Sequence, residues 1–369
     1  MPRYAQRVTA LADRLASRTL ELVDIPSQSL HEDAIREHVL GLVPPALQLE
    51  HAGDEVSLFL PPRRPGTPLV VLAGHYDTVP AQENLPGRIE DDAVHGLGSS
   101  DMKGGLAVAL EIVRDLDADG SGPYDVGLLL FGREELPSEH NPLPALFAGS
   151  AAVHEVSLAI LLEPTDLRVQ AGCLGNAVAR MTFHGASGHS ARPWLADNAI
   201  AHAVTGLAPL LSLPRREATV GGLTFFEVLS VTRLVAGIAD NVIPGEAVAT
   251  LNLRYPPDRT PDEAVAQLHA LAPAGATLEI VGNSPPGHVA TGSPLVHALR
   301  DASGSPVEPK QAWTNVADFT ANGIDAVNFG PGHTALAHHR DERVEVASLM
   351  SAYETLRRFL SGSVRDDAP

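Results

Sequence analysis

The stretch Val70-Val71-Leu72-Ala73-Gly74-His75-Tyr76-Asp77-Thr78-Val79-Pro80 decides the fold prediction. Its apolar first half is typical of a buried strand, which ends at a glycine followed by a histidine and an aspartate. Because side chains two residues apart on a strand share a face, we expect His75 and Asp77 to point the same way. A carboxylate that takes one ring N–H of a histidine leaves the other nitrogen free for a metal. A structural histidine is the alternative reading of these residues alone.

The size and composition of the chain predict a globular protein with more than one domain. It has 369 residues, of which 44% are hydrophobic and 19% charged, which is too long for one ordinary core. The net charge of −19 argues against nucleic acid or an anionic membrane as partner. The single cysteine, Cys173, allows no intrachain disulfide and favours a cytoplasmic location. We find no apolar run that resembles a signal peptide or a membrane span.

Further carboxylates follow apolar runs or precede a helix. They are Asp101 in a glycine-rich turn before a helix predicted over 106–116, Glu134 and Glu135 after a strand predicted over 126–131, and Glu163 after a strand predicted over 158–162. The ends of parallel strands meet at one edge of a sheet, so we expect these side chains to gather there. Such crowding is unfavourable without a cation, which predicts a pair of divalent metals. A helix N-cap for Asp101 and a solvated face for the glutamates are the alternatives.

The order of predicted elements gives an α/β fold: a mostly parallel sheet flanked by helices, interrupted by an inserted domain. After Ala171 the pattern changes to half-alternating strands and two helices, which favours an α+β sandwich. Pro285-Pro286-Gly287 marks the return to the first pattern. The predicted division is therefore 1–173, 174–286 and 287–369.

Adjacent histidines lie near the end of the chain. His338 and His339 follow a Gly-Pro-Gly turn and precede the acidic pair Asp341-Glu342. We expect one of them to be a metal ligand, and surface histidines are the alternative.

These motifs together resemble a known family. GHYDTVP, GSSDMKGG, the Glu-Glu pair, EPT and AHHRDE occur in the order and spacing of the dinuclear-zinc amidohydrolases, which include aminoacylases, acetylornithine deacetylases, glutamate-type carboxypeptidases and succinyl-diaminopimelate desuccinylases. GASGHSARPWLADNAI and NVIPGEA are similar to the lid-domain signatures of that family. AGCLGN, RYPPDR and NFGPG are most similar to the desuccinylases of high-GC Gram-positive bacteria.

The resemblance implies two zinc ions per subunit, with cobalt or manganese as possible substitutes. It assigns His75, Asp101 and Glu163 to one metal, and Asp101, Glu135 and His338 to the other, so that Asp101 bridges. Glu134 would be the general base and Asp77 would orient His75.

The inserted domain carries the remaining implied roles. By resemblance it is a lid and dimerisation domain, and His189 reaches the active site of the partner subunit in a homodimer. Substrate binding is assigned to Asn241, Arg254, Thr314 and Gly332. A surface role for His189 and a buried salt bridge for Arg254 are the alternatives from the residues themselves.

The implied function is a metal-dependent hydrolysis of a small N-acyl amino acid, with succinyl-diaminopimelate desuccinylase as the leading prediction. A deacylase or carboxypeptidase of the same family is the first alternative, and a non-catalytic binding protein the second. Asp318 favours the first alternative, because desuccinylases usually carry an arginine there. His333 replaces a frequent aspartate, and Arg133 precedes the glutamate pair, where we expect it to lower the glutamates' proton affinity.

Overall fold

The computed structural model describes residues 2–119 and 122–362. Contacts divide the chain into two compact units, the first formed by Met1–Ala171, Ala290–Glu308 and Asp318–Pro369 and the second by Gly172–Val289 and Pro309–Ala317. The segment Pro309–Ala317 thus packs with the second unit, although it lies in the third predicted range. Residues 363–369 of that range lie outside the described residues.

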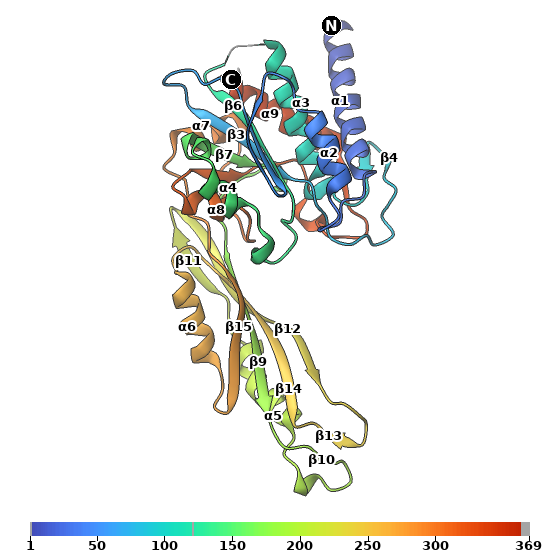
Figure 1. The fold of residues 1–369 in the computed structure, drawn as a ribbon, viewed down its shortest axis with the longest axis vertical. Coiled ribbons are helices and arrows are strands. Elements are labelled where there is room, and N and C mark those ends of the chain that lie inside the picture. The colour runs from blue at the N-terminus through green and yellow to red at the C-terminus, as the bar shows by residue number, and fades with distance from the viewer. Residues whose placement is uncertain (1, 120–121, 363–369) are drawn as a thin grey trace. The chain divides into compact units, whose positions relative to one another are not determined.

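The first unit combines one large sheet, a small sheet and the longer helices of the chain (Figure 1). Its helices are α1 (Pro2–Val23), α2 (Asp33–Gly41), α3 (Gly104–Asp119), α4 (Leu143–Gly149), α7 (Pro294–Ser303), α8 (Val316–Ala321) and α9 (Val346–Ser361). Its strands are β1 (Gln48–Gly53), β2 (Val56–Leu60), β3 (Leu69–His75), β4 (Arg88–Glu90), β5 (Ala93–His95), β6 (Asp125–Phe131), β7 (Val156–Leu161), β8 (Val169–Ala171), β16 (Val307–Pro309), β17 (Ala326–Asn328) and β18 (Arg343–Glu345).

The large sheet has the strand order β1-β2-β6-β3-β7-β17-β8-β16. Its central strands β6, β3, β7 and β17 run parallel, and antiparallel strands flank them. Every residue of β3 is buried, which follows from its continuous apolar run between two neighbours. The predicted fold class is confirmed, and the carboxyl ends of four adjacent strands meet at one edge of the sheet.

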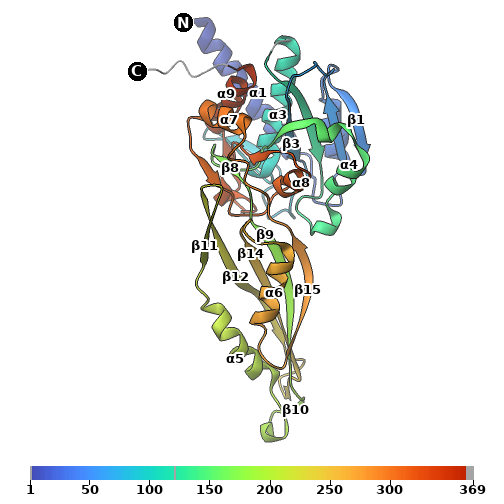
Figure 2. The same cartoon turned by 90° about the vertical axis from the view of Figure 1, so that its left-hand side faces the viewer.

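Helices cover both faces of this sheet (Figure 2). The helices α1, α3 and α9 pack together, and α3 lies against β3 and β6. The helix α4 contacts α8 through Phe147 and Phe319, whose rings meet edge to face at 5.3 Å. The turn that precedes α3 carries Asp101 and is thereby held at the carboxyl edge of the sheet.

The second unit is an antiparallel sheet with two helices on one face. Its elements are β9 (Gly175–His184), β10 (Gly188–His189), α5 (Ala199–Leu211), β11 (Arg216–Val220), β12 (Leu223–Ala236), β13 (Val242–Ile243), β14 (Glu246–Tyr255), α6 (Pro261–Leu271) and β15 (Ala276–Ser284). The strand order is β11-β12-β14-β9-β15, and β10 pairs separately with β13. Alternate residues of β9 and β14 form a core with α5 and α6, as expected for an α+β sandwich.

A helix long and apolar enough to cross a membrane is not found among the described residues.

Candidate metal centre

The predicted metal-binding side chains of the first unit lie together at the carboxyl edge of the parallel sheet. Their ligand atoms form three overlapping groups in which all atoms lie within 4.8 Å of one another. The groups are His75/Asp101/Glu163, Asp101/Glu135/His338 and His75/Glu134/Glu135. The sheet therefore gathers the residues that the sequence predicted to meet.

His75 is fully buried at the end of β3. Its Nδ1 lies 3.3 Å from Asp77 Oδ1, and its Nε2 lies 3.4 Å from Asp101 Oδ1 and 3.9 Å from Glu163 Oε1. Burial disfavours the charged ring, but contacts with Asp101 and Asp77 outweigh it and raise the pKa of His75 well above its ordinary value. Among the described residues, Nε2 makes no hydrogen bond, so its orientation suits a ligand rather than a core histidine.

Asp77 is fixed from three sides. The Ser29 hydroxyl donates to Oδ2 at 2.7 Å, and the backbone N–H groups of Glu134 and Glu135 donate at 3.1 and 3.2 Å. Burial opposes its charge, but His75 and these donors lower its pKa. A charged, immobile Asp77 holds the His75 ring and leaves Nε2 for another partner.

Asp101 lies between the two histidines. Its Oδ1 faces His75, whereas its Oδ2 lies 3.5 Å from His338 Nε2. His338 also contacts Glu135 Oε1 at 2.9 Å, and its backbone has a positive φ of 60°. Opposite oxygens of one carboxylate thus face the two ligand groups.

The glutamates of the site are crowded. Burial, with the nearby Glu163, raises the pKa of Glu134 well above its usual range. Burial also raises the pKa of Glu135, although the hydrogen bond with His338 lowers it in part. Mutual repulsion of this kind is relieved by a cation or by a proton.

Arg133, which we expected to lower the proton affinity of the glutamate pair, makes its ion pairs with other carboxylates. Its guanidinium lies 3.1 Å from Asp54 and 3.9 Å from Glu55, and the pKa of both glutamates is raised. Asp54 and Glu55 attract the arginine because they follow β1 on the neighbouring part of the sheet.

The residues present fit divalent cations. The site offers imidazole nitrogens and carboxylate oxygens that lie within 4.8 Å of one another in each group, and zinc accepts both kinds of donor. The buried Nε2 of His75, which has no hydrogen-bond partner in the described part of the chain, would gain a partner. Which metal binds does not follow from this donor set, since cobalt and manganese use it too.

Gly332 packs on the loop that carries Asp101. A Cβ at this position would lie 2.3 Å from the Ser100 carbonyl oxygen, so only glycine allows this approach. Its predicted role in substrate binding stays a prediction.

The remaining predicted residues belong to the second unit. His189 is exposed in β10, where it pairs with Val242 of β13, and the backbone N–H of Ala191 donates to its Nδ1 at 3.0 Å. The exposed Asn241 lies close by, since its carbonyl accepts from the Ser190 N–H at 3.0 Å. The pairing of β10 with β13 therefore brings two of the predicted residues together.

Arg254 and Thr314 are more enclosed. Arg254 is half-buried on β14 and donates from Nε to Asn252 Oδ1 at 3.0 Å. It makes no salt bridge with any residue that the structure describes, so the alternative of a structural ion pair has no support. Thr314 is buried, and its carbonyl accepts from Cys173 Sγ at 3.5 Å.

The two departures from the desuccinylase pattern have local partners. Asp318 accepts from the Asn141 amide at 3.1 and 3.0 Å, so one side of its carboxylate is held by the loop that follows the glutamate pair. His333 bonds Asp166 through Nδ1 and lies 2.8 Å from Glu345 through Nε2.

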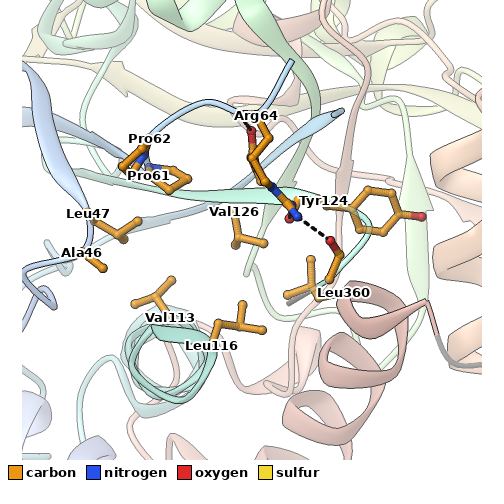
Figure 3. A pocket seen from close by; sticks show the side chains of 12 residues that line it. Ala46, Leu47, Pro61, Pro62, Arg64, Val113, Leu116, Tyr124, Val126 and Leu360 are labelled. Atoms are coloured by element: carbon orange, nitrogen blue, oxygen red, sulfur yellow. Dashed lines mark hydrogen bonds and ion pairs between the residues drawn. The ribbon is translucent and has the colours of Figure 1, made fainter. Parts of the chain in front are cut away.

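An apolar cavity of about 220 Å³ opens elsewhere in the first unit (Figure 3). The Arg64 guanidinium at its side donates to the Tyr124 carbonyl at 2.6 Å. Because the cavity lies where β6 begins and the glutamate pair follows its end, the two are at opposite ends of the strand. Its lining includes Leu47, Val113, Leu116, Val126 and Leu360.

Sequence reasoning missed two buried side chains that hold this site. Ser29 bonds Asp77, but a lone serine in a loop carries no signal. Glu342 bonds the backbone around Asp101; only its place in an acidic pair after the histidines pointed to it.

Comparisons with known proteins agree with this geometry. The sequence model of peptidase family M20/M25/M40 matches residues 71–362. A Mycobacterium tuberculosis protein that carries the name DapE is 37% identical over 352 residues, covering 93% of this chain and 97% of its own. A succinyl-diaminopimelate desuccinylase of Corynebacterium glutamicum is 35% identical over 355 residues, covering 93% and 95%.

A solved structure shares the fold. It is the Bacillus subtilis YXEP protein, described as a dinuclear metal binding peptidase of the M20 family, with a TM-score of 0.69 and 15% identity over 96% of this chain and 99% of that one. The family match and these relatives identify the chain as a member of peptidase family M20/M25/M40, a metal-dependent hydrolase of amide bonds.

Proposed function

We propose that the chain hydrolyses N-succinyl-LL-2,6-diaminopimelate to succinate and LL-2,6-diaminopimelate, in the cytoplasm and in the service of lysine synthesis. The relatives named for this activity align over more than nine tenths of the chain. The observation that carries the chemistry is Asp101 between two histidines, with Glu134 beside it. The domain division 1–173, 174–286 and 287–369 remains part of this proposal.

Two zinc ions per subunit would complete the site. His75, Asp101 and Glu163 would hold one, and Asp101, Glu135 and His338 the other. When bound, the ions would polarise the amide carbonyl and acidify a water molecule. The crowding of these side chains supports the assignment, because several carboxylates in one place favour divalent cations.

The chain's own groups would move the proton and orient the partners. Glu134 would take the proton of the attacking water and pass it to the leaving amine. Asp77, held by Ser29, would keep His75 in its ligand orientation. Arg254, which has no carboxylate partner among the described residues, would receive a carboxylate of the substrate with its planar fork, alongside Asn241, Thr314 and Gly332.

A homodimer through the second unit would supply His189 to the partner's site. One observation supports this assembly: β11 pairs with β12 only over 223–227, so the rest of β12 is an edge in the described part of the sheet. Val228, Leu234 and Val235 on this edge are 38%, 47% and 49% exposed. Exposed apolar edges are templates for pairing with another chain.

Sedimentation would test the dimer. A dimer at assay concentration, weakened by Leu234→Asp, is the expected result. An active monomer would contradict both the assembly and the role of His189.

A second candidate function rests on Asp318. An acidic group in place of the desuccinylase arginine opposes an anionic substrate end and would suit an amine. This favours a related deacylase, such as one acting on acetylornithine.

A release assay on purified, zinc-loaded protein separates the two functions. Succinyl-diaminopimelate and acetylornithine are offered in parallel, with a chelator control. Fast, chelator-sensitive release of succinate is expected. Release of acetate alone would favour the second candidate function. No release from either compound would refute both candidate functions.

A further inference from the structure

The turn that carries Asp101 is held by one distant carboxylate. Glu342 is 2% exposed. Its Oε1 accepts from the backbone N–H groups of Ser100 and Asp101, and its Oε2 accepts from that of Gly98, each at 2.9 Å. Because both oxygens accept, the ionised form is the one that fits these bonds.

The turn needs such an acceptor. Gly98 has a positive φ of 79°, and Asp101 has φ −122° and ψ 95°, which is not helical. The N–H groups of Gly98, Ser100 and Asp101 therefore point to one side, where regular secondary structure does not receive them. Buried backbone donors require a partner, and Glu342 provides it for all of them.

The same residue is tied to a second ligand. Glu342 lies four residues after His338 in the sequence, and its carbonyl accepts from the Gly96 N–H at 3.0 Å. The His338 carbonyl in turn accepts from Gln82 Nε2 at 2.9 Å. The segment that carries His338 is thus bonded through the side chain and the backbone of Glu342 to the segment that carries Asp101.

A buried lysine belongs to the same turn, where the Lys103 N–H donates to the Gly98 carbonyl at 2.7 Å. Lys103 is 1% exposed, and its Nζ donates to the Ile25 carbonyl at 2.9 Å. Burial lowers the pKa of Lys103 to about 7, and the negative charge of Glu342 opposes this shift.

We propose that Glu342 is a positioning residue that locks the Asp101 turn to the His338 segment, so that these two ligands are in register before a metal binds. The inference rests on the proposed metal centre and adds a residue that acts on the ligands through the backbone. It predicts that the acceptor geometry of Glu342, and not only its charge, sets the affinity for the metal.

The test compares variants that separate geometry from charge. Glu342→Gln keeps the length but loses one acceptor oxygen and the charge, whereas Glu342→Asp keeps the charge but loses the reach. Asp341→Asn removes the same charge from an exposed neighbour and serves as the control. Zinc affinity is measured by competition with a chromophoric chelator, with thermal unfolding of the metal-free proteins alongside.

We expect both Glu342 variants to lose about 10- to 100-fold in affinity for the weaker zinc ion, and Asp341→Asn to stay within about twofold of the parent. Loss in Glu342→Gln with full affinity in Glu342→Asp would mean that the charge alone matters and would overturn the proposal. Unchanged affinity in both variants would also overturn it.

A measurement on the parent chain tests the proposal even if the variants fail to fold. Amide hydrogen exchange of the metal-free protein should protect Gly98, Ser100 and Asp101 as strongly as the strands beside them. Rapid exchange of these amides would refute a preformed turn. Because this readout needs neither zinc nor substrate, it can fail while the proposed hydrolase activity holds, and it can succeed if that activity is absent.

Discussion

The candidate metal centre and the β10–β13 strand pair hold their functional side chains in opposite ways. His75 is fully buried, and Asp77 beside it receives donors from Ser29 and from two backbone N–H groups. His189 is exposed on a strand of two residues that pairs only with β13 within the described residues. The first site is built by the fold of its own unit, and the second is presented to solvent.

This difference separates two kinds of function. A metal ligand must be oriented before the metal binds, and burial and hydrogen bonds provide that orientation. A group that acts on a bound substrate can remain exposed until substrate or partner arrives. Substitutions at the metal centre should therefore change metal binding, and substitutions in the β10–β13 strand pair should change turnover alone.

Glu134→Gln should give the largest effect on turnover. The side chain lies within the ligand groups, and loss of a general base typically costs 10²- to 10⁴-fold in rate, so we expect about that loss in kcat. Zinc content should stay at the parental value, because the proposed metal sets do not include Glu134. Glu139→Gln, an exposed glutamate on the following loop, is the control; full turnover by Glu134→Gln would exclude it as the base.

His189→Ala should follow, with kcat lower by about 10²- to 10³-fold if the imidazole donates to the developing oxyanion. Zinc affinity should not change, since His189 belongs to the second unit. His184→Ala, another exposed histidine of that unit, should retain activity. If His189→Ala kept its full turnover, or if it lost zinc, the proposed difference between the metal centre and the His189 site would be wrong.

Ser29→Ala should produce a smaller loss confined to the buried site. Removing the 2.7 Å bond to Asp77 loosens the orientation of His75, and we expect zinc affinity to fall by about tenfold. Ser27→Ala is a matched control, because Ser27 is also buried and its hydroxyl has no hydrogen-bond partner in the ranges described. Equal zinc titrations for both variants would show that Asp77 needs no support from Ser29.

The buried strands and their ends were predictable from the sequence. The apolar run of residues 69–73 matches β3, and the alternation of strands and helices gave the parallel core, since both signals depend on local periodicity. The short strands β4, β5 and β18 were not predicted. They form a separate sheet from segments far apart in the chain, and three-residue strands have too little periodicity to detect.

The metal ligands were predictable because each follows a strand end or a turn with its own local signal. The residues that hold these ligands in place were not predictable. Ser29 lies 48 positions from Asp77, and Glu342 lies 241 positions from Asp101, so only the fold shows that they meet. The ion pair of Arg133 with Asp54 was not predicted for the same reason, because the two residues lie 79 positions apart.

His333 gives the smallest expected effect, because it is a half-exposed contact in the same unit as the buried His75. Asp166 raises its pKa above the ordinary value of 6.5, and the pKa of Asp166 is lowered from 3.8 despite partial burial. The contribution of His333 to stability is therefore full below pH 6.5 and is lost as the pH rises through its raised pKa. The contribution of Asp166 is lost as the pH falls through its lowered pKa. We expect His333→Gln to reduce the free energy of unfolding by less than about 1 kcal/mol near pH 6, because both groups are more than a third exposed. The reduction should shrink at alkaline pH in urea titrations. A reduction of the same size at both pH values would mean that His333 acts by packing and not by charge.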